Sequence, residues 1–154
     1  MKEKKPLKTI KIRKLRVKDL PQVIRIEEAI TKAKVGQPKK ACLRDHIQKE
    51  GSVSFVALSE GQVVGFLISE ILTNSFGLDQ SGWIENFGIL PSHMGQGIGR
   101  ALANYLFQVY RKKKIFEIHT SVRWDSVDLL SFFKSTGFDH SGFINLYKKL
   151  DEKE

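Results

Sequence analysis

The strongest constraint on this sequence is a glycine-rich segment that joins an apolar strand to an amphipathic helix. Residues 89–100 are Ile-Leu-Pro-Ser-His-Met-Gly-Gln-Gly-Ile-Gly-Arg, with glycine at every second position from 95 to 99. Apolar residues then recur at helical spacing from Ile98 to Val109, so a long helix begins inside the glycines. Amides in the first turn of a helix have no carbonyl partner, and the helix dipole adds positive charge there. Because glycine lets a ligand approach the backbone closely, the segment predicts a socket for a pyrophosphate.

Two other phosphate-binding motifs fail on spacing. A P-loop requires Gly-Lys followed by Ser or Thr, and the sequence has no such run. The dinucleotide motif G-x-G-x-x-G would need glycine where Arg100 stands, and its acidic residue should end the next strand, whereas Glu117 lies inside one. A plain tight turn is the remaining alternative, and the strand-loop-helix context favours the phosphate site over it.

Hydrophobic periodicity predicts an α/β (α+β) fold with the element order β-α-α-β-β-β-α-β-α-β. Early strands should pair as antiparallel neighbours, and the helix after the glycines should make one parallel crossover. Asp19, followed by Pro21, predicts the start of the first helix, and Asp125 predicts the start of the last one. The other expected segments are a strand at 9–15, a helix at 39–50, a hairpin at 53–71, a loop at 73–81, strands at 83–90 and 115–122, and a last strand at 142–150.

Charge is concentrated at the N-terminus. The chain has 154 residues and a net charge of +9, and residues 1–18 alone carry nine basic residues and one acid. We therefore predict a flexible basic arm at 1–7, which keeps the protein soluble or contacts a polyanion, followed by a single domain at 8–150. Apolar stretches are too short for a membrane span, and the single cysteine excludes an intrachain disulfide or a cysteine-rich zinc cluster. We expect a cytoplasmic protein without a metal.

The glycine segment and its flanks resemble the GNAT superfamily of N-acetyltransferases. The acetyl-CoA motif of that family, Gln/Arg-x-x-Gly-x-Gly/Ala, follows a strand that ends in small-Val-x-Pro. Residues 88–91, Gly-Ile-Leu-Pro, match the strand end, and residues 97–99 match the glycine core. Residues 133–138 are similar to the family ending Tyr-x-x-x-Gly-Phe, with Phe133 in place of the tyrosine. The resemblance implies a twisted mixed sheet of six or seven strands with about four helices, and it is compatible with a homodimer.

The resemblance also implies acetyl-CoA as the co-substrate. The pantetheine arm would lie beside Phe87, Gly88 and Ile89 like an added strand, and a bulge would free an amide near Ile89 for the thioester carbonyl. Ser126 stands where many members have asparagine. Met94 replaces the usual arginine or glutamine, so we expect weaker CoA binding. The pyrophosphate would lie on the amides of Gly95, Gln96, Gly97, Ile98, Gly99 and Arg100.

Candidates for proton transfer follow from strand geometry. Glu85 is the first choice as general base, because period-two alternation places it on one strand face with Phe87 and Ile89. His119, in the next strand, is the second candidate, and Tyr147 is a candidate acid because Phe133 removes the usual one. Each of them also fits an ordinary packing or surface role. Two further groups are candidates for binding the acceptor: the carboxylates of Glu70, Asp79 and Glu85 as an acidic mouth, and the rings of Phe76, Trp83 and Trp124 as a pocket.

The sequence thus predicts an N-acetyltransferase that moves an acetyl group from acetyl-CoA to an amine by direct attack in a ternary complex. The acceptor could be a protein N-terminus, a lysine or a small amine. A non-catalytic acyl-CoA-binding or sensing module is the first alternative, favoured by Met94 and Phe133. An RNA-associated adaptor that uses the basic arm is the second.

Overall fold

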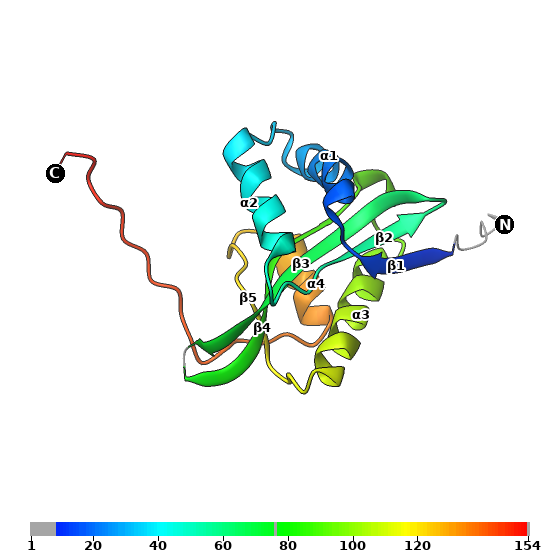
Figure 1. Ribbon diagram of the computed structural model, residues 1–154. Helices are drawn as coiled ribbons and strands as arrows, with labels where there is room; N and C mark the ends of the chain where they lie inside the picture. Colours follow the sequence, from blue (N-terminus) through cyan, green and yellow to red (C-terminus); the bar gives the residue numbers. More distant parts are fainter. Residues whose placement is uncertain (1–8, 76, 154) are drawn as a thin grey trace. The chain divides into compact units, whose positions relative to one another are not determined.

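The computed structural model describes residues 9–75 and 77–153. It divides between Ser121 and Val122 into two compact units. The first unit contains a sheet with α1 and α2 against one face and α3 against the other (Figure 1). The predicted arm at 1–7 lies outside the described residues, and the single domain at 8–150 stays a prediction.

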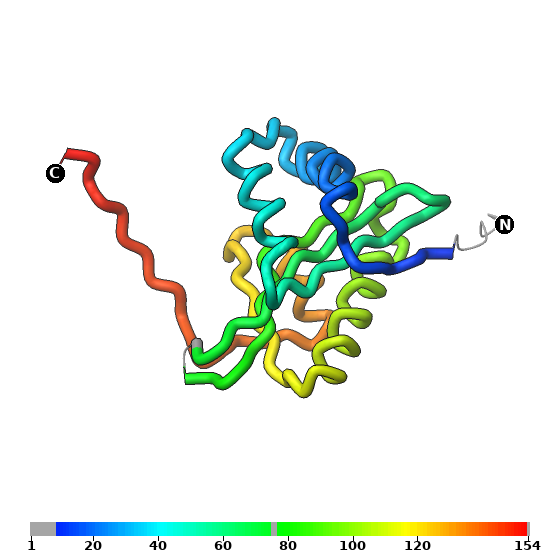
Figure 2. Tube along the Cα trace, in the orientation of Figure 1, coloured from blue at the N-terminus to red at the C-terminus, as the bar shows by residue number. Residues whose placement is uncertain are grey.

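The sheet has five strands that lie in sequence order, and Figure 2 shows how the chain passes through them. Neighbouring strands are antiparallel from β1 to β4, and β5 is parallel to β4. The crossover between β4 and β5 contains α3, so the predicted antiparallel start and later parallel crossover are confirmed. The strands are β1 (Ile10–Lys14), β2 (Phe55–Ser59), β3 (Gln62–Ser75), β4 (Leu78–Ile89) and β5 (Ile118–Thr120).

Alternate residues of the central strands point into two different cores. The helices of the first unit are α1 (Leu20–Thr31), α2 (Gln37–Gln48) and α3 (Ile98–Lys112), with short 3-10 helices η1 (Val17–Asp19) and η2 (Pro91–His93). On the face of α1 and α2, Phe66 and Ile68 pack with buried residues of both helices. On the opposite face, the ring of Tyr105 in α3 lies 4.8 Å from that of Phe55.

Tyr110 ties α3 to the middle of the sheet. Its side chain is completely buried, and its ring lies against Gly82, where an added Cβ would come within 2.7 Å of the ring carbon Cζ. This close approach lets the hydroxyl lie 2.9 Å from Ser69 Oγ and donate to the Glu70 carbonyl at 3.2 Å. Burial raises the pKa of Tyr110 to about 12, so the phenol stays neutral.

Asp19 lies at the predicted start of the first helix, but its carboxylate does not cap that helix. It accepts two hydrogen bonds from the Arg13 guanidinium, at 2.7 and 2.8 Å, and one from the Arg16 amide at 2.8 Å. The hydrogen bonds from Arg13 lower the pKa of Asp19 despite its burial. The carboxylate therefore joins β1 to the turn before α1.

Two predictions about strands and loops are wrong. The expected loop at 73–81 is mostly strand, because β3 and β4 continue as a long hairpin to the Ser75–Leu78 pair. The expected last strand at 142–150 has no strand partner within the part of the chain that the structure describes, so the sheet has five strands and not six or seven. Apolar residues in that segment occur as adjacent pairs, such as Phe143-Ile144, which give neither strand face an apolar surface.

The second unit contains α4 (Val127–Ser135) and an extended C-terminal segment. Phe133 is buried, with ring contacts to Phe132 at 5.3 Å and to Phe138 at 5.0 Å. The predicted capping role of Asp125 is wrong, because its carboxylate binds the Arg123 guanidinium and Ser126 holds the N-cap position. In the described part of the chain, no helix is both long and apolar enough to cross a membrane.

Replacing Gly82 by alanine tests the contact between the sheet and Tyr110. The new methyl group would displace a fully buried ring, so we expect the free energy of unfolding to fall by about 1–3 kcal/mol. Urea denaturation measures this change. Gly142→Ala is the matched control, because a Cβ at that position meets nothing within 4 Å. Equal stability of both variants would contradict the packing described for Tyr110.

Candidate functional site

A bulge interrupts β4 at Glu85. On the partner strand β3, Ile68 pairs with Asn86 and Ser69 pairs with Ile84, so Glu85 is an extra residue without a counterpart. Such a bulge places two successive side chains on one face of the sheet. Glu85 and Asn86 accordingly both point toward the helices α1 and α2, where their side chains approach His46 and Glu27.

The bulge changes the strand face that the sequence predicts for Glu85. Ile89 packs on the opposite face, where its side chain lies over Gly65 beside Ile98 of α3. The expectation that Glu85 and Ile89 share a face is therefore wrong, because one inserted residue reverses the alternation. The bulge was also expected near Ile89, and the structure places it four positions earlier.

Pairing between β4 and β5 ends at the same place. β5 pairs only with Gly82, Trp83 and Ile84, and the Thr120 hydroxyl donates to the Ile84 carbonyl at 3.0 Å. Beyond Ile84, no strand pairs with this edge of β4 among the residues that the structure describes. The edge from Glu85 to Ile89 is therefore open.

Amide directions along β4 show which donors face the open edge. The amide of Leu90 donates to the Val64 carbonyl of β3 at 2.8 Å. Because successive amides of a strand point to opposite edges, the Ile89 amide points away from β3 toward the open side. The Phe87 amide, two residues earlier, donates to the Asn86 side chain at 2.9 Å. Ile89 is thus the better placed of the two for an incoming acceptor.

The glycine loop presents main-chain donors to solvent. Gly95 and Gly97 have φ values of +76° and +80°, in the region that favours glycine, and nothing lies within 4 Å of an added Cβ. Gly97 is the N-cap of α3, and its carbonyl accepts from Ala101 at 3.0 Å. Within the described chain, the amides from Gly95 to Gly99 donate to no protein acceptor. The loop can therefore offer these donors to an anion.

One face of the sheet collects several of the predicted residues. Glu70 of β3 pairs with Trp83 of β4, which pairs with His119 of β5, so the three side chains form a row across the strands. The rings of Trp83 and His119 stack with centroids 4.6 Å apart. His119 also lies 3.7 Å from the Glu117 carboxylate. The row lies one residue before the last pair between β4 and β5, Ile84 with Thr120, and Glu85 follows directly after that pair.

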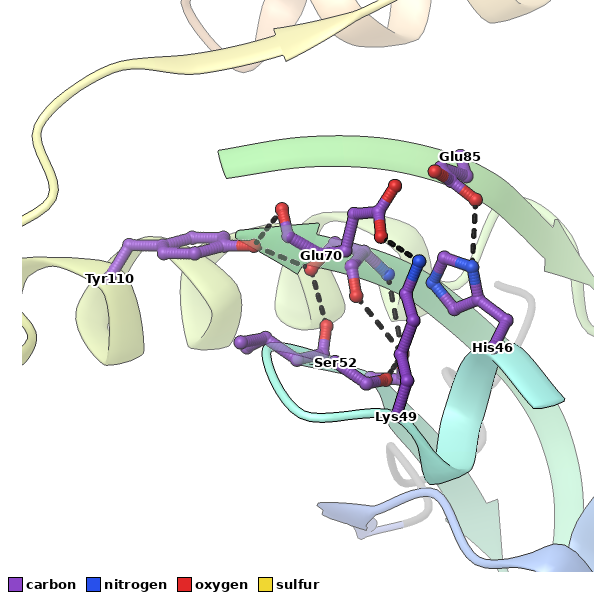
Figure 3. A network of polar contacts seen from close by, with 9 residues as sticks. His46, Lys49, Ser52, Glu70, Glu85 and Tyr110 are labelled. Carbon is purple, nitrogen blue, oxygen red and sulfur yellow. Dashed lines mark hydrogen bonds and ion pairs between the residues drawn. The ribbon is translucent and has the colours of Figure 1, made fainter. Parts of the chain in front are cut away.

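Glu85 is in contact with a polar network from α2 and β3 (Figure 3). His46 Nδ1 lies 2.9 Å from Glu85 Oε2, and the Lys49 ammonium forms an ion pair with the Glu70 carboxylate. The His46 and Glu70 side chains are 10% exposed, whereas the Glu85 side chain is 43% exposed. The network therefore has a buried interior and one carboxyl that solvent can reach.

The network separates the acidities of its two carboxyl groups. Burial, and then the hydrogen bond and charge of Glu70, raise the pKa of Glu85 to about 7. Burial would also raise the pKa of Glu70, but its hydrogen bonds with Glu85 and Lys49 lower it. Burial and the Lys49 charge lower the pKa of His46. At neutral pH, Glu85 is thus poised between its two protonation states beside an ionised Glu70.

The same cluster has the composition of a metal site. One ligand atom each from His46, Glu70 and Glu85 lies within 4.8 Å of the others. The Lys49 ammonium, however, is already paired with Glu70 and supplies the positive charge of the cluster. A divalent cation would meet that charge directly, so we assign the cluster to an ion-pair network.

The remaining predicted residues are not brought to this cluster. Asp79 lies six residues before Glu85 in β4, which is about 20 Å along an extended strand. Of the three carboxylates predicted to line the acceptor site, only Glu70 and Glu85 therefore lie together. Ser126, Tyr147 and Trp124 belong to the second unit, and their part in a site stays a prediction. Phe76 lies outside the described residues.

Sequence reasoning missed His46 and Lys49. The helix that carries His46 is mostly polar, and no motif surrounds it. A weak signal did exist, because His46 lies between the buried Leu43 and Ile47 on the apolar side of that helix. A polar side chain on a buried helix face requires a partner, but only the tertiary structure shows that the partner is Glu85.

Comparison with known proteins gives a consistent result. Residues 20–138 match the model of the Acetyltransferase (GNAT) family. The chain is 25% identical over 108 residues to the [Ribosomal protein bS18]-alanine N-acetyltransferase of Escherichia coli (strain K12), covering 70% of this chain and 69% of that protein.

Solved structures of acetyltransferases have a similar fold. An aminoglycoside acetyltransferase from an uncultured soil metagenomic sample, in complex with sisomicin, superposes with a TM-score of 0.77 at 27% identity, covering 92% of this chain and 97% of that one. An aminoglycoside N-acetyltransferase in complex with CoA has a TM-score of 0.77 at 17% identity, covering 92% of this chain and 95% of that one, which shows a shared fold.

Titration of Glu85 tests the electrostatics of the cluster. We expect its side-chain carboxyl carbon to titrate with a midpoint of about 7 in the unliganded protein, because burial and Glu70 disfavour its charge. Carbon-13 NMR across pH 4–9 measures the midpoint, and the spectrum of Glu85→Gln assigns the signal. A midpoint near the ordinary glutamate value of about 4.3 would contradict the described environment.

Proposed function

The chain belongs to the acetyltransferase (GNAT) family and is an acyl-CoA-dependent acetyltransferase that uses acetyl-CoA, and we propose that it acetylates a primary amine with Glu85 as general base. The observation that carries this proposal is the position of Glu85. It lies on the bulge where β4 and β5 separate, partly exposed, with a pKa of about 7. A base with that acidity is matched to proton transfer at neutral pH.

The glycine loop is the proposed site for the pyrophosphate of acetyl-CoA. The unoccupied amides from Gly95 to Gly99 and the positive end of α3 support this assignment. Met94, at the position where the family usually has arginine or glutamine, is 53% exposed and adds no charge. The backbone therefore supplies most of the proposed contact with the phosphates.

The open edge of β4 is the proposed place for the pantetheine arm and the thioester. The outward amide of Ile89 would donate to the thioester carbonyl and stabilise the oxyanion that forms there. Glu85 lies further back along the same edge, on the side of α2. An acceptor amine entering from that side would pass Glu85 before it reaches the thioester carbon, and its proton would go to Glu85 directly or through one water.

Acetyl transfer then needs no enzyme-bound intermediate. The lone pair of a neutral amine forms the C–N bond, and the C–S bond breaks with its electron pair on sulfur. Glu85 takes the proton from the nitrogen, and the thiolate takes one from Glu85 or from water. A thiol is a modest leaving group, with a pKa of about 8.5, so the absence of a tyrosine at position 133 is compatible with turnover.

Amines are the proposed acceptors for two reasons. The relatives named above are an alanine N-acetyltransferase and aminoglycoside acetyltransferases. Glu85 also gives the proposed acceptor side a partly exposed carboxyl group that attracts a cationic amine before the amine loses its proton. A turnover screen with acetyl-CoA against N-terminal alanyl peptides, lysine peptides and aminoglycosides identifies which amine is used.

Replacing Glu85 by glutamine tests the general base. The carboxylate must be ionised to accept a proton, so kcat/KM of the wild type should fall as the pH drops below about 7. We expect Glu85→Gln to lower kcat/KM at pH 8 by roughly 100-fold. It should also remove the decrease of kcat/KM below about pH 7, which is the acidic limb of the pH profile. Deprotonation of the acceptor amine adds a second limb at higher pH in both proteins. An unchanged pH profile would rule out Glu85.

Replacing Gly97 by alanine tests the phosphate loop. Its φ of +80° strains any other side chain, and the methyl group would intrude where the phosphate should lie. We expect the Kd for CoA to rise about tenfold or more, as measured by calorimetry. Gly61→Ala is the matched control, because Gly61 has φ +79° and equally open surroundings in the turn between β2 and β3. Equal affinities would contradict the assignment.

A further inference from the structure

Glu70 lies behind the proposed base, at a position where its charge controls that base. It comes from β3, next to Trp83 of β4, and it is buried. One of its carboxyl oxygens lies within 4.8 Å of a carboxyl oxygen of Glu85. Two carboxyl groups this close do not ionise independently, because the second charge would form beside the first.

Lys49 determines which of the two carboxyl groups stays ionised. Its ammonium is ion-paired with Glu70, and the hydrogen bond and the charge of Lys49 both favour the charged form of Glu70. The Lys49 charge also favours the ionised form of Glu85, but it is the smallest of the effects on the pKa of that group. The direct contact of Glu85 is with His46 Nδ1, at 2.9 Å. The shared proton is therefore directed to Glu85, the carboxyl at the open edge of β4.

The neighbourhood contains few other charges that could replace this effect. Glu27 of α1 is paired with Lys39 and approaches Glu85 only through Asn86, whose amide lies 3.5 Å from it. Tyr110 of α3 reaches Ser69 and the Glu70 carbonyl as a neutral phenol. Among the described residues, the titratable and charged groups near the pair are Lys39 and His46 of α2, Lys49 directly after α2, Glu27 of α1, Tyr110 of α3 and His119 of β5.

We propose that Glu70, held by Lys49, is a positioning residue that disfavours the loss of the proton from Glu85 and thereby sets the pH range of acetyl transfer. The inference rests on the proposed function, because it assigns Glu70 a role through Glu85. It adds a second carboxylate and a lysine to the reaction, neither of which contacts the reacting atoms. The His46 imidazole completes the arrangement by fixing the orientation of the Glu85 carboxyl.

Two substitutions should shift the pKa of Glu85 in opposite directions. Glu70→Gln keeps the size and a hydrogen-bond acceptor for Lys49 but removes the negative charge, so the acidic limb of kcat/KM should shift by about one pH unit or more toward acid. Lys49→Met leaves the Glu70 charge without its partner, so the limb should shift toward alkaline pH. A purely structural role for either residue would lower activity at every pH without moving the limb.

The control is Glu50→Gln, which removes the same charge from an exposed residue directly after Lys49. We expect its pH profile to match that of the wild type. Carbon-13 titration of Glu85 in the unliganded variants gives a readout without turnover, and its midpoint should move in the same direction as the limb. If Glu70→Gln fails to fold, Lys49→Met carries the test, because the Lys49 side chain is 46% exposed.

The outcomes separate the two proposals. If Glu85→Gln removes the limb but neither Glu70→Gln nor Lys49→Met moves it or the NMR midpoint, the role of Glu70 is overturned and Glu85 remains the base. If Glu85→Gln retains the limb, the proposed function itself fails, whatever Glu70 does. Opposite shifts in the two variants, with an unchanged Glu50→Gln control, establish the role of Glu70.

Discussion

The extra residue in β4 is the feature on which the site depends. Without it, Glu85 would lie on the same face as Ile89, against α3 and away from His46. The bulge turns Glu85 toward α2 at the position where β5 stops pairing, so the side chain lies at an open strand edge. One irregularity in the hydrogen-bond ladder thus provides both the open edge and the direction of the proposed base.

The sheet around the bulge is held by packing from both sides. Tyr110 fills the space left by Gly82 on one face, and its hydroxyl bonds to the β3 backbone at Glu70. On the other face, the apolar residues of α1 and α2 pack against β2 and β3 and bring His46 and Lys49 to the edge of the core. Rigid packing of this kind holds a coupled carboxyl pair at a fixed distance, which a flexible loop could not do.

The electrostatics of the site follow from unequal burial of similar groups. Glu70 and Glu85 have the same chemistry, but Glu70 is buried and paired with Lys49, whereas Glu85 faces the open edge. The glycine loop differs in kind, since its donors are main-chain amides that bond to no acceptor within the described residues. The proposed reaction therefore combines a neutral backbone site for the phosphates with a charged side-chain network for the proton.

The sequence alone determined the features that depend on local pattern. Glycines at 95, 97 and 99 next to a helical periodicity identified the loop and the family, and alternation identified most of the strands. It could not locate the bulge, because inserting one residue into a ladder depends on the partner strand. It also could not join His46, Lys49, Glu70 and Glu85, which lie up to 39 positions apart and meet only when α2 packs beside β3 and β4. Local propensities fix which elements form, whereas the contacts between elements decide which side chains share a proton.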